Sequence, residues 1–219
     1  MFGIGSLFKK KNYPDSYKTY LEGFKKDEKK LLSETRFVVF DTETTGLNVV
    51  KDRVLSIGAI SVLDNTINVN DTFEVYVQQE VFKSESVEIH EILKNNPNQS
   101  KVTEIEAIKQ FLSYVKNDIL VGHHVGFDIE MMNRMLLRNN LGKLRNQYLD
   151  TGVLFKKSKH LVYQENLKNY SLDDLCEELK IEKTDRHTAT GDALITAIAF
   201  QKILARLDKN GNLKLKDLF

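Results

Sequence analysis

Two carboxylates that are two positions apart, Asp41 and Glu43, directly follow the apolar run at 37–40. A continuous apolar run predicts a central strand that is buried on both faces. Residues i and i+2 of a strand point to the same side, roughly 6 to 7 Å apart, so both carboxylates should project together past the carboxyl end of this strand. Such a pair repels unless a cation lies between its members, and oxygen ligands suit Mg²⁺ or Mn²⁺. The alternative is a pair of loop carboxylates that caps the turn at 44–46.

Two further aspartates stand at the starts of expected helices. Asp128 follows a short apolar run and a glycine-marked loop, a position where an aspartate ordinarily caps a helix. Asp192 precedes the apolar stretch at 193–207 and should be largely buried, where an unpaired carboxylate is costly and a metal ion would serve as a partner. His187 lies in the loop just ahead of Asp192, and a histidine there can accept a proton from water. A histidine in such a loop is by itself more often a surface residue.

A histidine pair, His123 and His124, lies in the loop before Asp128. Adjacent residues on an extended backbone face opposite ways, so we expect at most one of the two to reach a given site. No cysteine or further nearby histidine completes a zinc set, which argues against a zinc site here.

Together these segments resemble the DEDDh group of 3′→5′ exonucleases, a DnaQ-like family that includes the proofreading epsilon subunit of bacterial DNA polymerase III. The motifs read FDTETTGL at 40–47, GHHVGFD at 122–128 and HTATGDA at 187–193, and their order and spacing agree with the family. The resemblance runs from about residue 37 to about residue 200 and implies a ribonuclease H-like fold.

The resemblance also implies a two-metal site with a histidine base. Asp41, Glu43 and Asp192 would hold one Mg²⁺ or Mn²⁺ ion, Asp41 and Asp128 would hold a second, and His187 would take the proton of the attacking water. The pocket for the terminal nucleotide would be lined by Thr44, Leu47, His90, His124 and Phe127. Family members commonly carry asparagine where this chain has His124, so the contact at that position is expected to differ.

By the same resemblance the chain would be a metal-dependent 3′→5′ exonuclease that releases nucleoside 5′-monophosphates. A single-stranded or frayed DNA 3′ end is favoured over RNA as substrate, in proofreading or repair, with a DNA polymerase catalytic subunit or a sliding clamp as candidate partners. The alternatives are an RNA-trimming exoribonuclease and an inactive nucleic-acid-binding scaffold of the same fold. A degenerate scaffold would be expected to have lost at least one of the five catalytic residues, and all five are present.

The pattern of apolar residues predicts the elements that position these side chains. Strands are expected at 37–40, 54–62, 67–77 and 119–121, with a tight hairpin turn at 64–65. Helices are expected at 102–115, 129–137, 172–179 and 193–207, the last of them deep in the core. An opening hairpin followed by alternating helices and strands predicts an α/β domain with a mixed sheet flanked by helices.

The chain is expected to divide into a basic N-terminal extension at 1–35, an exonuclease domain at 36–208 and a C-terminal tail at 209–219. Apolar residues between Tyr13 and Phe24 recur at helical spacing, which predicts a helix packed on the flank of the domain. The alternative is a basic arm that contacts nucleic acid. The tail ends in Leu218 and Phe219, which resemble the anchors of clamp-docking peptides. The alternative, favoured on general grounds, is a tail that folds back onto the domain.

Composition sets few further limits. The chain has 219 residues, 41% of them hydrophobic and 29% charged, and a net charge of +1 that predicts no particular partner. Its single cysteine, Cys176, excludes an internal disulfide and is expected to be a small buried residue. No stretch has the apolar length of a membrane span, and apolar residues precede the N-terminal lysines, the reverse of a signal peptide. We therefore expect a cytoplasmic protein.

Overall fold

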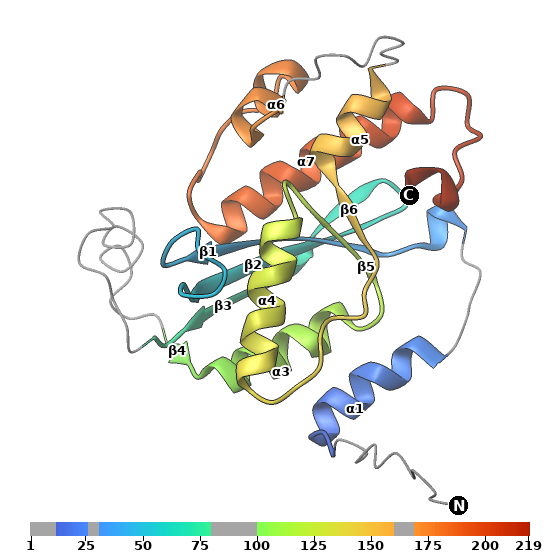
Figure 1. Cartoon of the computed structure of the whole chain (residues 1–219). Helices are drawn as coiled ribbons and strands as arrows, with labels where there is room; N and C mark the ends of the chain where they lie inside the picture. Colours follow the sequence, from blue (N-terminus) through green and yellow to red (C-terminus); the bar gives the residue numbers. More distant parts are fainter. Residues whose placement is uncertain (1–11, 26–30, 80–99, 160–168) are drawn as a thin grey trace, which may run out of the picture.

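A six-stranded mixed sheet forms the centre of the molecule. The computed structural model describes residues 12–25, 31–79, 100–159 and 169–219 (Figure 1). The strand order is β4-β3-β2-β1-β5-β6, with strands β1 (Phe37–Thr44), β2 (Val54–Leu63), β3 (Thr66–Val77), β4 (Lys101–Val102), β5 (Ile119–Gly122) and β6 (Tyr148–Asp150). Strands β1, β2 and β3 pair antiparallel, whereas β5 is parallel to β1 and to β6. The predicted mixed sheet is confirmed.

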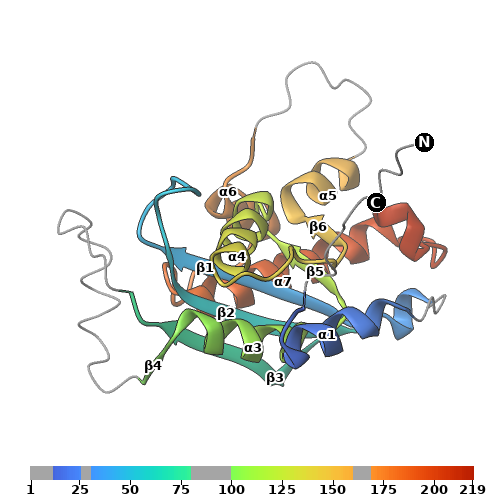
Figure 2. The same ribbon diagram turned by 60° about the horizontal axis from the view of Figure 1, so that its bottom comes forward.

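Helices cover both faces of this sheet (Figure 2). One face carries α1 (Asp15–Glu22), α3 (Glu104–Val115) and α4 (Gly126–Arg138), and the other carries α5 (Thr151–Ser158), α6 (Leu172–Leu179) and α7 (Ala189–Leu207). The alternation along β1 divides the core accordingly: Val38 and Phe40 pack with α3 and α4, while Phe37 and Val39 pack with α7. Strand β1 is therefore buried on both sides, as its apolar run predicts.

The β2–β3 connection is the tight hairpin that the sequence predicts. Asp64 and Asn65 both have positive φ, 48° and 52°, as a type I′ turn requires.

The structure corrects the bounds of other predicted elements. Strand β1 continues through Thr44, because its pairing with β2 extends that far, so Asp41 and Glu43 lie on the strand and not beyond it. Strands β4 and β6 and helix α5 have no counterpart among the predicted elements. The helix expected at 102–115 begins only at Glu104, because Val102 lies on β4 and pairs with Val77 of β3.

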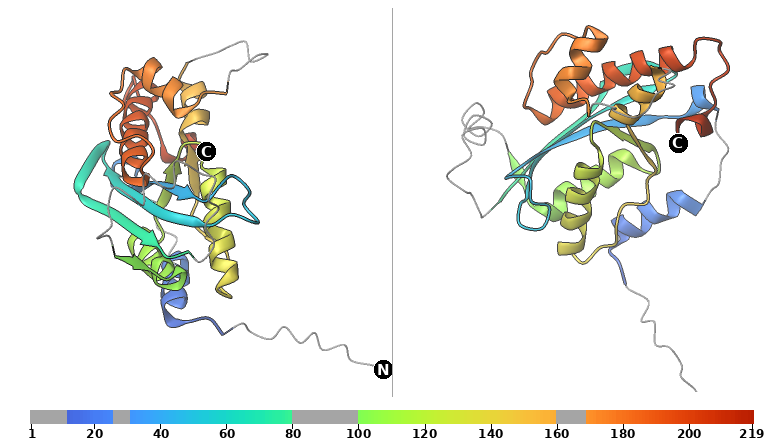
Figure 3. Two further views of the ribbon diagram at one scale, coloured as in Figure 1. Left: turned by 90° about the vertical axis from the view of Figure 1, so that its left-hand side faces the viewer. Right: turned by 45° about the horizontal axis from the view of Figure 1, so that its top comes forward.

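The N-terminal extension contains the expected helix, α1, which packs against α3 (Figure 3). Tyr17 is buried and donates through its hydroxyl to the Lys143 carbonyl at 2.8 Å. The Tyr20 hydroxyl donates to Asn146 Oδ1 at 2.7 Å and accepts from the Arg145 amide at 2.6 Å. These bonds join α1 to the segment between α4 and β6, which makes the helix part of the packed fold.

The C-terminal tail folds back onto the domain. Its short 3₁₀ helix, η3 (Leu215–Leu218), places Leu218 in the core on the α7 side with 2% exposure, while Phe219 is 49% exposed. Lys157 donates to the Leu218 carbonyl at 3.3 Å. The structure therefore has the fold-back arrangement, and a docking peptide anchored on Leu218 would require this tail to detach.

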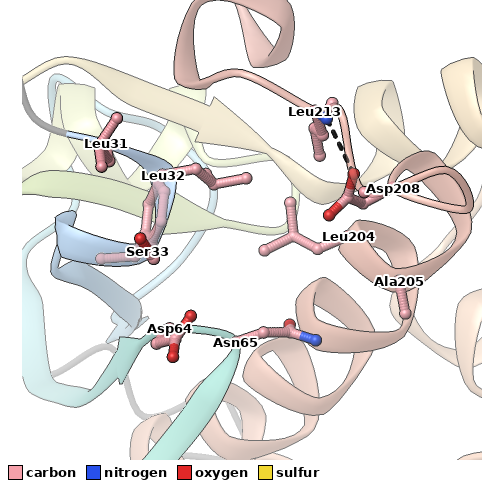
Figure 4. Close-up of a pocket in the computed structure, with 11 residues that line it drawn as sticks. Leu31, Leu32, Ser33, Asp64, Asn65, Leu204, Ala205, Asp208 and Leu213 are labelled. Carbon is pink, nitrogen blue, oxygen red and sulfur yellow. Dashed lines mark hydrogen bonds between the residues drawn. The ribbon is translucent and has the colours of Figure 1, made fainter.

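A cavity of about 530 Å³ lies between the 3₁₀ helix η2 (Leu32–Glu34), the β2–β3 turn and the end of α7 (Figure 4). Its lining includes the buried side chains of Phe37 and Leu204, and the Leu213 amide donates to Asp208 Oδ1 at 2.8 Å between two further lining residues. None of the sequence-predicted site residues lines it. No helix in the described ranges is long and apolar enough to cross a membrane.

Candidate active site

Strand β1 presents Asp41 and Glu43 on the face of the sheet that α7 covers. Asp41 is paired with Gly58 of β2 and Glu43 with Ser56. Both acids continue the alternation of Phe37 and Val39, which lie in the core beneath α7. The predicted same-side arrangement of the two carboxylates follows from the period of two along the strand.

The start of α7 brings Asp192 to these two carboxylates. Thr188 caps the helix by accepting the Gly191 amide at 3.0 Å, which leaves Asp192 in the first turn. Ligand oxygens of Asp41, Glu43 and Asp192 all lie within 4.8 Å of one another. Asp41 and Asp192 are 151 positions apart along the chain, so the fold and not local sequence makes the cluster.

This close approach depends on a glycine in β2. A Cβ built on Gly58 would lie 2.3 Å from the Ala189 carbonyl carbon and 2.3 Å from the Thr190 nitrogen. Glycine inside a β-branched strand commonly marks a place where another backbone approaches. The absence of a side chain at Gly58 therefore allows the start of α7 to lie close to Asp41. Gly58 is a functional residue that sequence reasoning missed.

Gly58→Ala should push the start of α7 away from β1. Overpacking of this kind costs roughly 1 to 3 kcal/mol, or about 2 to 12 °C in Tm for a domain of this size. A displacement of Asp192 by about 1 Å should lower the rate of the proposed reaction on the order of 100-fold. Gly23→Ala is the matched control, because a Cβ at Gly23 would make only ordinary contacts from 3.5 Å. Thermal melting and a nuclease assay on both variants check this, and a Gly58→Ala protein with normal rate would refute it.

Asp128 approaches from the opposite face of the sheet. Thr42 points away from Asp41 and Glu43, and Asp128 Oδ1 accepts from the Thr42 amide at 3.0 Å and from its hydroxyl at 2.6 Å. The β1–β5 pairing ends at Val39, which leaves this edge of β1 open to the first turn of α4. Asp128 is 4% exposed and stands outside the group of three carboxylates that lie within 4.8 Å.

Burial and mutual repulsion dominate the electrostatics of these acids. Burial raises the pKa of Asp41 well above its usual range, repulsion from Asp128, Asp192 and Glu43 raises it further, and Arg186 opposes the rise. Burial also raises the pKa of Asp128 to about 7, against the two bonds from Thr42 that favour its charged form. Carboxylate oxygens concentrated at one poorly solvated place are a donor set that fits a hard divalent cation.

Asp128→Asn should stabilise the metal-free protein at pH 8. The raised pKa means that the folded chain holds a proton which the unfolded chain releases near pH 4, so stability is lost as pH rises from about 4 through about 7. Asparagine keeps the oxygen that accepts both Thr42 bonds and removes the charge. We expect a Tm in chelator that is higher than that of the unaltered chain by roughly 5 °C or more at pH 8, with the gain gone near pH 4.

The matched control is Asp71→Asn on β3, which removes a carboxylate paired with Arg36 at 2.8 Å. Loss of this pair should lower the Tm, whereas Asp128→Asn raises it. Differential scanning calorimetry across pH measures both. An Asp128→Asn protein that melts lower at pH 8 would contradict the conclusion that burial destabilises the charged form of Asp128.

The loop ahead of α7 carries a cation that sequence reasoning did not include in the site. Arg186 forms an ion pair with Asp192 through its Nη1, and its Nε donates to Asp173 Oδ1 of α6 at 3.2 Å. His187 is exposed and has a φ of 64°. It makes no hydrogen bond or ion pair with the described part of the chain. His187, the expected base, therefore lies near the same end of α7 as Asp192 and is exposed to solvent.

The residues expected to contact the terminal nucleotide are placed as follows. Leu47 is 86% exposed at the tip of the β1–β2 loop, and Thr44 donates to the Gly46 carbonyl at 2.9 Å. His124 is exposed and Phe127 is partly buried at the start of α4. His90 lies outside the described residues.

The expectation that His123 and His124 face opposite ways is wrong. His124 has a φ of 53°, so the backbone there is left-handed and not extended, and the two rings lie 4.3 Å apart. Burial, with a smaller effect of His124, lowers the pKa of His123 to about 4. Its Nε2 donates to the Tyr170 carbonyl at 2.9 Å, and its Nδ1 lies 3.0 Å from the Thr151 hydroxyl. His123 thus links the loop before α4 to the start of α5 and to the segment before α6 by hydrogen bonds.

Residues 38–200 match the RNase_T family model, whose description is exonuclease. The DNA polymerase III subunit epsilon of Aquifex aeolicus is 33% identical over 176 residues, which cover 80% of this chain and 84% of that protein. The PolC-type DNA polymerase III of Caldanaerobacter subterraneus subsp. tengcongensis is 35% identical over 179 residues, which cover 81% of this chain and 12% of that protein.

Solved structures of exonuclease I share the fold. One of them superposes with a TM-score of 0.65 at 19% identity and covers 84% of this chain and 42% of that one. The E. coli enzyme in complex with a dT13 oligonucleotide superposes with a TM-score of 0.61 at 18% identity, over 81% of this chain and 41% of that one. Likeness at this identity shows the ribonuclease H-like fold.

The chain belongs to the RNase_T exonuclease family, and its resemblance to the DnaQ-like exonucleases is confirmed. The matched range, 38–200, contains β1, α4 and the acidic start of α7. The chain spans about an eighth of the length of the PolC-type relatives that it matches.

Proposed function

We propose that this chain hydrolyses phosphodiester bonds one nucleotide at a time from the 3′ end of DNA and releases nucleoside 5′-monophosphates. The observation that carries the proposal is the cluster of Asp41, Glu43 and Asp192 within 4.8 Å, built by two distant elements of an exonuclease domain. In this proposal residues 36–208 form the catalytic domain, with 1–35 as an N-terminal extension and 209–219 as a C-terminal tail.

The acidic cluster suits a divalent cation, and we propose that Mg²⁺ or Mn²⁺ is the ion used. Asp41, Glu43 and Asp192 would hold one ion, and Asp41 together with Asp128 would hold a second. The bound ions would supply a water of lowered pKa and offset the charge that develops on the leaving 3′ oxygen. Binding would relieve the repulsion that raises the pKa of Asp41 in the metal-free chain.

The remaining steps fall to side chains of this protein. His187, exposed ahead of α7, would take the proton from the attacking water. Leu47, with 86% of its surface exposed in the loop that follows β1, would offer an apolar contact to the terminal base. Thr44, His124, Phe127 and His90 would contact the same nucleotide. Asp52 holds the Leu47 loop in place by accepting from the Thr45 hydroxyl at 3.1 Å and the Asn48 amide at 2.8 Å.

Single-stranded or frayed DNA is the proposed substrate, and proofreading or repair in the cytoplasm is the proposed role. Two findings support this choice: a relative named as the epsilon subunit of DNA polymerase III matches over most of its length, and exonuclease I of the same fold has been solved with an oligonucleotide of deoxythymidines. A DNA polymerase catalytic subunit is the proposed partner.

Digestion of end-labelled oligomers by the purified chain tests the proposal. With Mg²⁺ or Mn²⁺ we expect a ladder that shortens from the 3′ end of single-stranded DNA, release of 5′-monophosphates, and arrest by a 3′ phosphate or by chelator. Faster digestion of RNA of the same sequence would favour the exoribonuclease alternative. Cleavage within circular single-stranded DNA, or no digestion of any substrate, would overturn the proposal.

A further inference from the structure

Arg186 lies beside the acidic cluster and offsets part of its negative charge in the absence of metal. Its side chain is 17% exposed and is held from two sides, by Asp192 at the start of α7 and by Asp173 on α6. Asp192 is itself 7% exposed. The guanidinium is therefore a partly buried cation in direct contact with one of the three clustered carboxylates.

The contact has a consequence for metal binding. Arg186 Nη1 is paired with Oδ1 of Asp192, so a divalent cation held by this carboxylate would lie close to the positive guanidinium, and the two positive charges would repel each other. Asp192 is thus engaged by Arg186 before any metal arrives. The three carboxylates are positioned for a cation, but one of them has a counter-ion supplied by the chain.

We propose that Arg186 is a built-in counter-ion that occupies Asp192 in the metal-free protein and releases it when the metal binds, with Asp173 retaining the guanidinium. The proposal rests on the metal site of the proposed function. It assigns to Arg186 a positioning role that sets the affinity of the chain for metal, distinct from any contact with the reacting atoms.

Asp173 makes the release feasible. Its Oδ1 already lies 3.2 Å from Arg186 Nε, so the guanidinium keeps one carboxylate when it leaves the other. The Asp173 side chain is 49% exposed and also lies 3.5 Å from Lys183 Nζ. Rotation of Arg186 toward Asp173 would carry the charge outward into solvent and would not leave it buried without a partner.

The test is Mn²⁺ binding, measured by calorimetry on the full chain without substrate. Arg186→Gln should bind Mn²⁺ about tenfold more tightly than the unaltered chain, since a charge-assisted hydrogen bond no longer competes. Its Tm in chelator should be lower, and saturating Mn²⁺ should remove most of that difference. The matched control is Arg134→Gln, which removes the partly exposed pair with Glu130 on α4 and should leave the Mn²⁺ affinity unchanged.

Asp173→Asn should change the Mn²⁺ affinity in the opposite direction. Without the charge of Asp173, Arg186 is confined to Asp192, so Mn²⁺ should bind several-fold more weakly. This variant leaves the acidic cluster intact and keeps the test decisive if Arg186→Gln fails to fold. Arg186→Lys should lie between, because a lysine cannot bridge both carboxylates as a guanidinium does.

Equal or weaker Mn²⁺ binding by Arg186→Gln would overturn the counter-ion role. If the unaltered chain binds Mn²⁺ and digests DNA while Arg186→Gln has unchanged affinity, this inference alone falls. If the unaltered chain binds no Mn²⁺ at all, the proposed metal site falls, and the inference falls with it.

Discussion

Asp41→Asn should lower the rate of 3′-end digestion by about three orders of magnitude or more while the chain stays folded. Asp41 is the carboxylate that both proposed metal positions share, and stabilisation of transition-state charge by such ions is worth several kcal/mol, at about 1.4 kcal/mol per tenfold in rate. The substitution conserves shape and removes one of the charges that raise the free energy of the metal-free cluster. We therefore expect a Tm in chelator no lower than that of the unaltered chain.

Asp71→Asn is the control for this experiment, because it removes a carboxylate of the same sheet that pairs with Arg36 and lies outside the acidic cluster. That variant should lose stability and keep its activity. Single-turnover digestion of a labelled oligomer at saturating Mn²⁺ gives the rates. An Asp41→Asn protein within about tenfold of the unaltered rate would exclude Asp41 from the proposed metal chemistry.

The local part of this site could be predicted from the sequence because it depends on short-range periodicity. The period of two along a strand is enough to place Asp41 and Glu43 on one side. The apolar stretch after Asp192 is enough to predict a buried carboxylate at the start of a core helix. Both predictions need only residues that are close in sequence to the group in question.

What the sequence could not provide is the relation between elements that are distant along the chain. Asp128 lies on the face of β1 opposite Asp192 and accepts a hydrogen bond from Thr42. It can do so because β5 stops pairing with β1 at Val39, before the strand reaches Thr42. The ion pair between Arg186 and Asp192 depends on a loop that also contacts Asp173 of α6. Gly58 was the one available signal, since a glycine within a strand suggests close approach, but its neighbour on α7 could not be named.

Strand β6 and helix α5 escaped prediction for a different reason. A strand of three residues is too short for its period to be recognised, and it exists because β5 offers it a parallel partner. Helix α5 did have a start signal, since the Asp150 side chain accepts from the Gly152 amide at 2.8 Å and from the Val153 amide at 3.2 Å. An aspartate just before an apolar stretch is the usual sequence sign of such a cap.

His187→Asn should lower the rate at neutral pH by roughly 100- to 10,000-fold, the usual contribution of a general base. Asparagine is the informative replacement, because the backbone at His187 has a φ of 64° and asparagine adopts this left-handed conformation more readily than alanine does. The turn that leads to Thr188 and the helix start should therefore survive, and with it the position of Asp192. His187 is exposed and stands apart from the clustered carboxylates, so Mn²⁺ affinity should stay unchanged.

Two further measurements distinguish a base from a residue that only shapes the loop. If His187 accepts the proton of the attacking water, part of the lost rate should return at high pH, where hydroxide takes the place of the base. A residue that only positions α7 would show a uniform loss across pH together with weaker Mn²⁺ binding, since Asp192 would then be displaced. A loss smaller than about threefold at neutral pH would show that His187 is not the base, because general bases contribute far more than that.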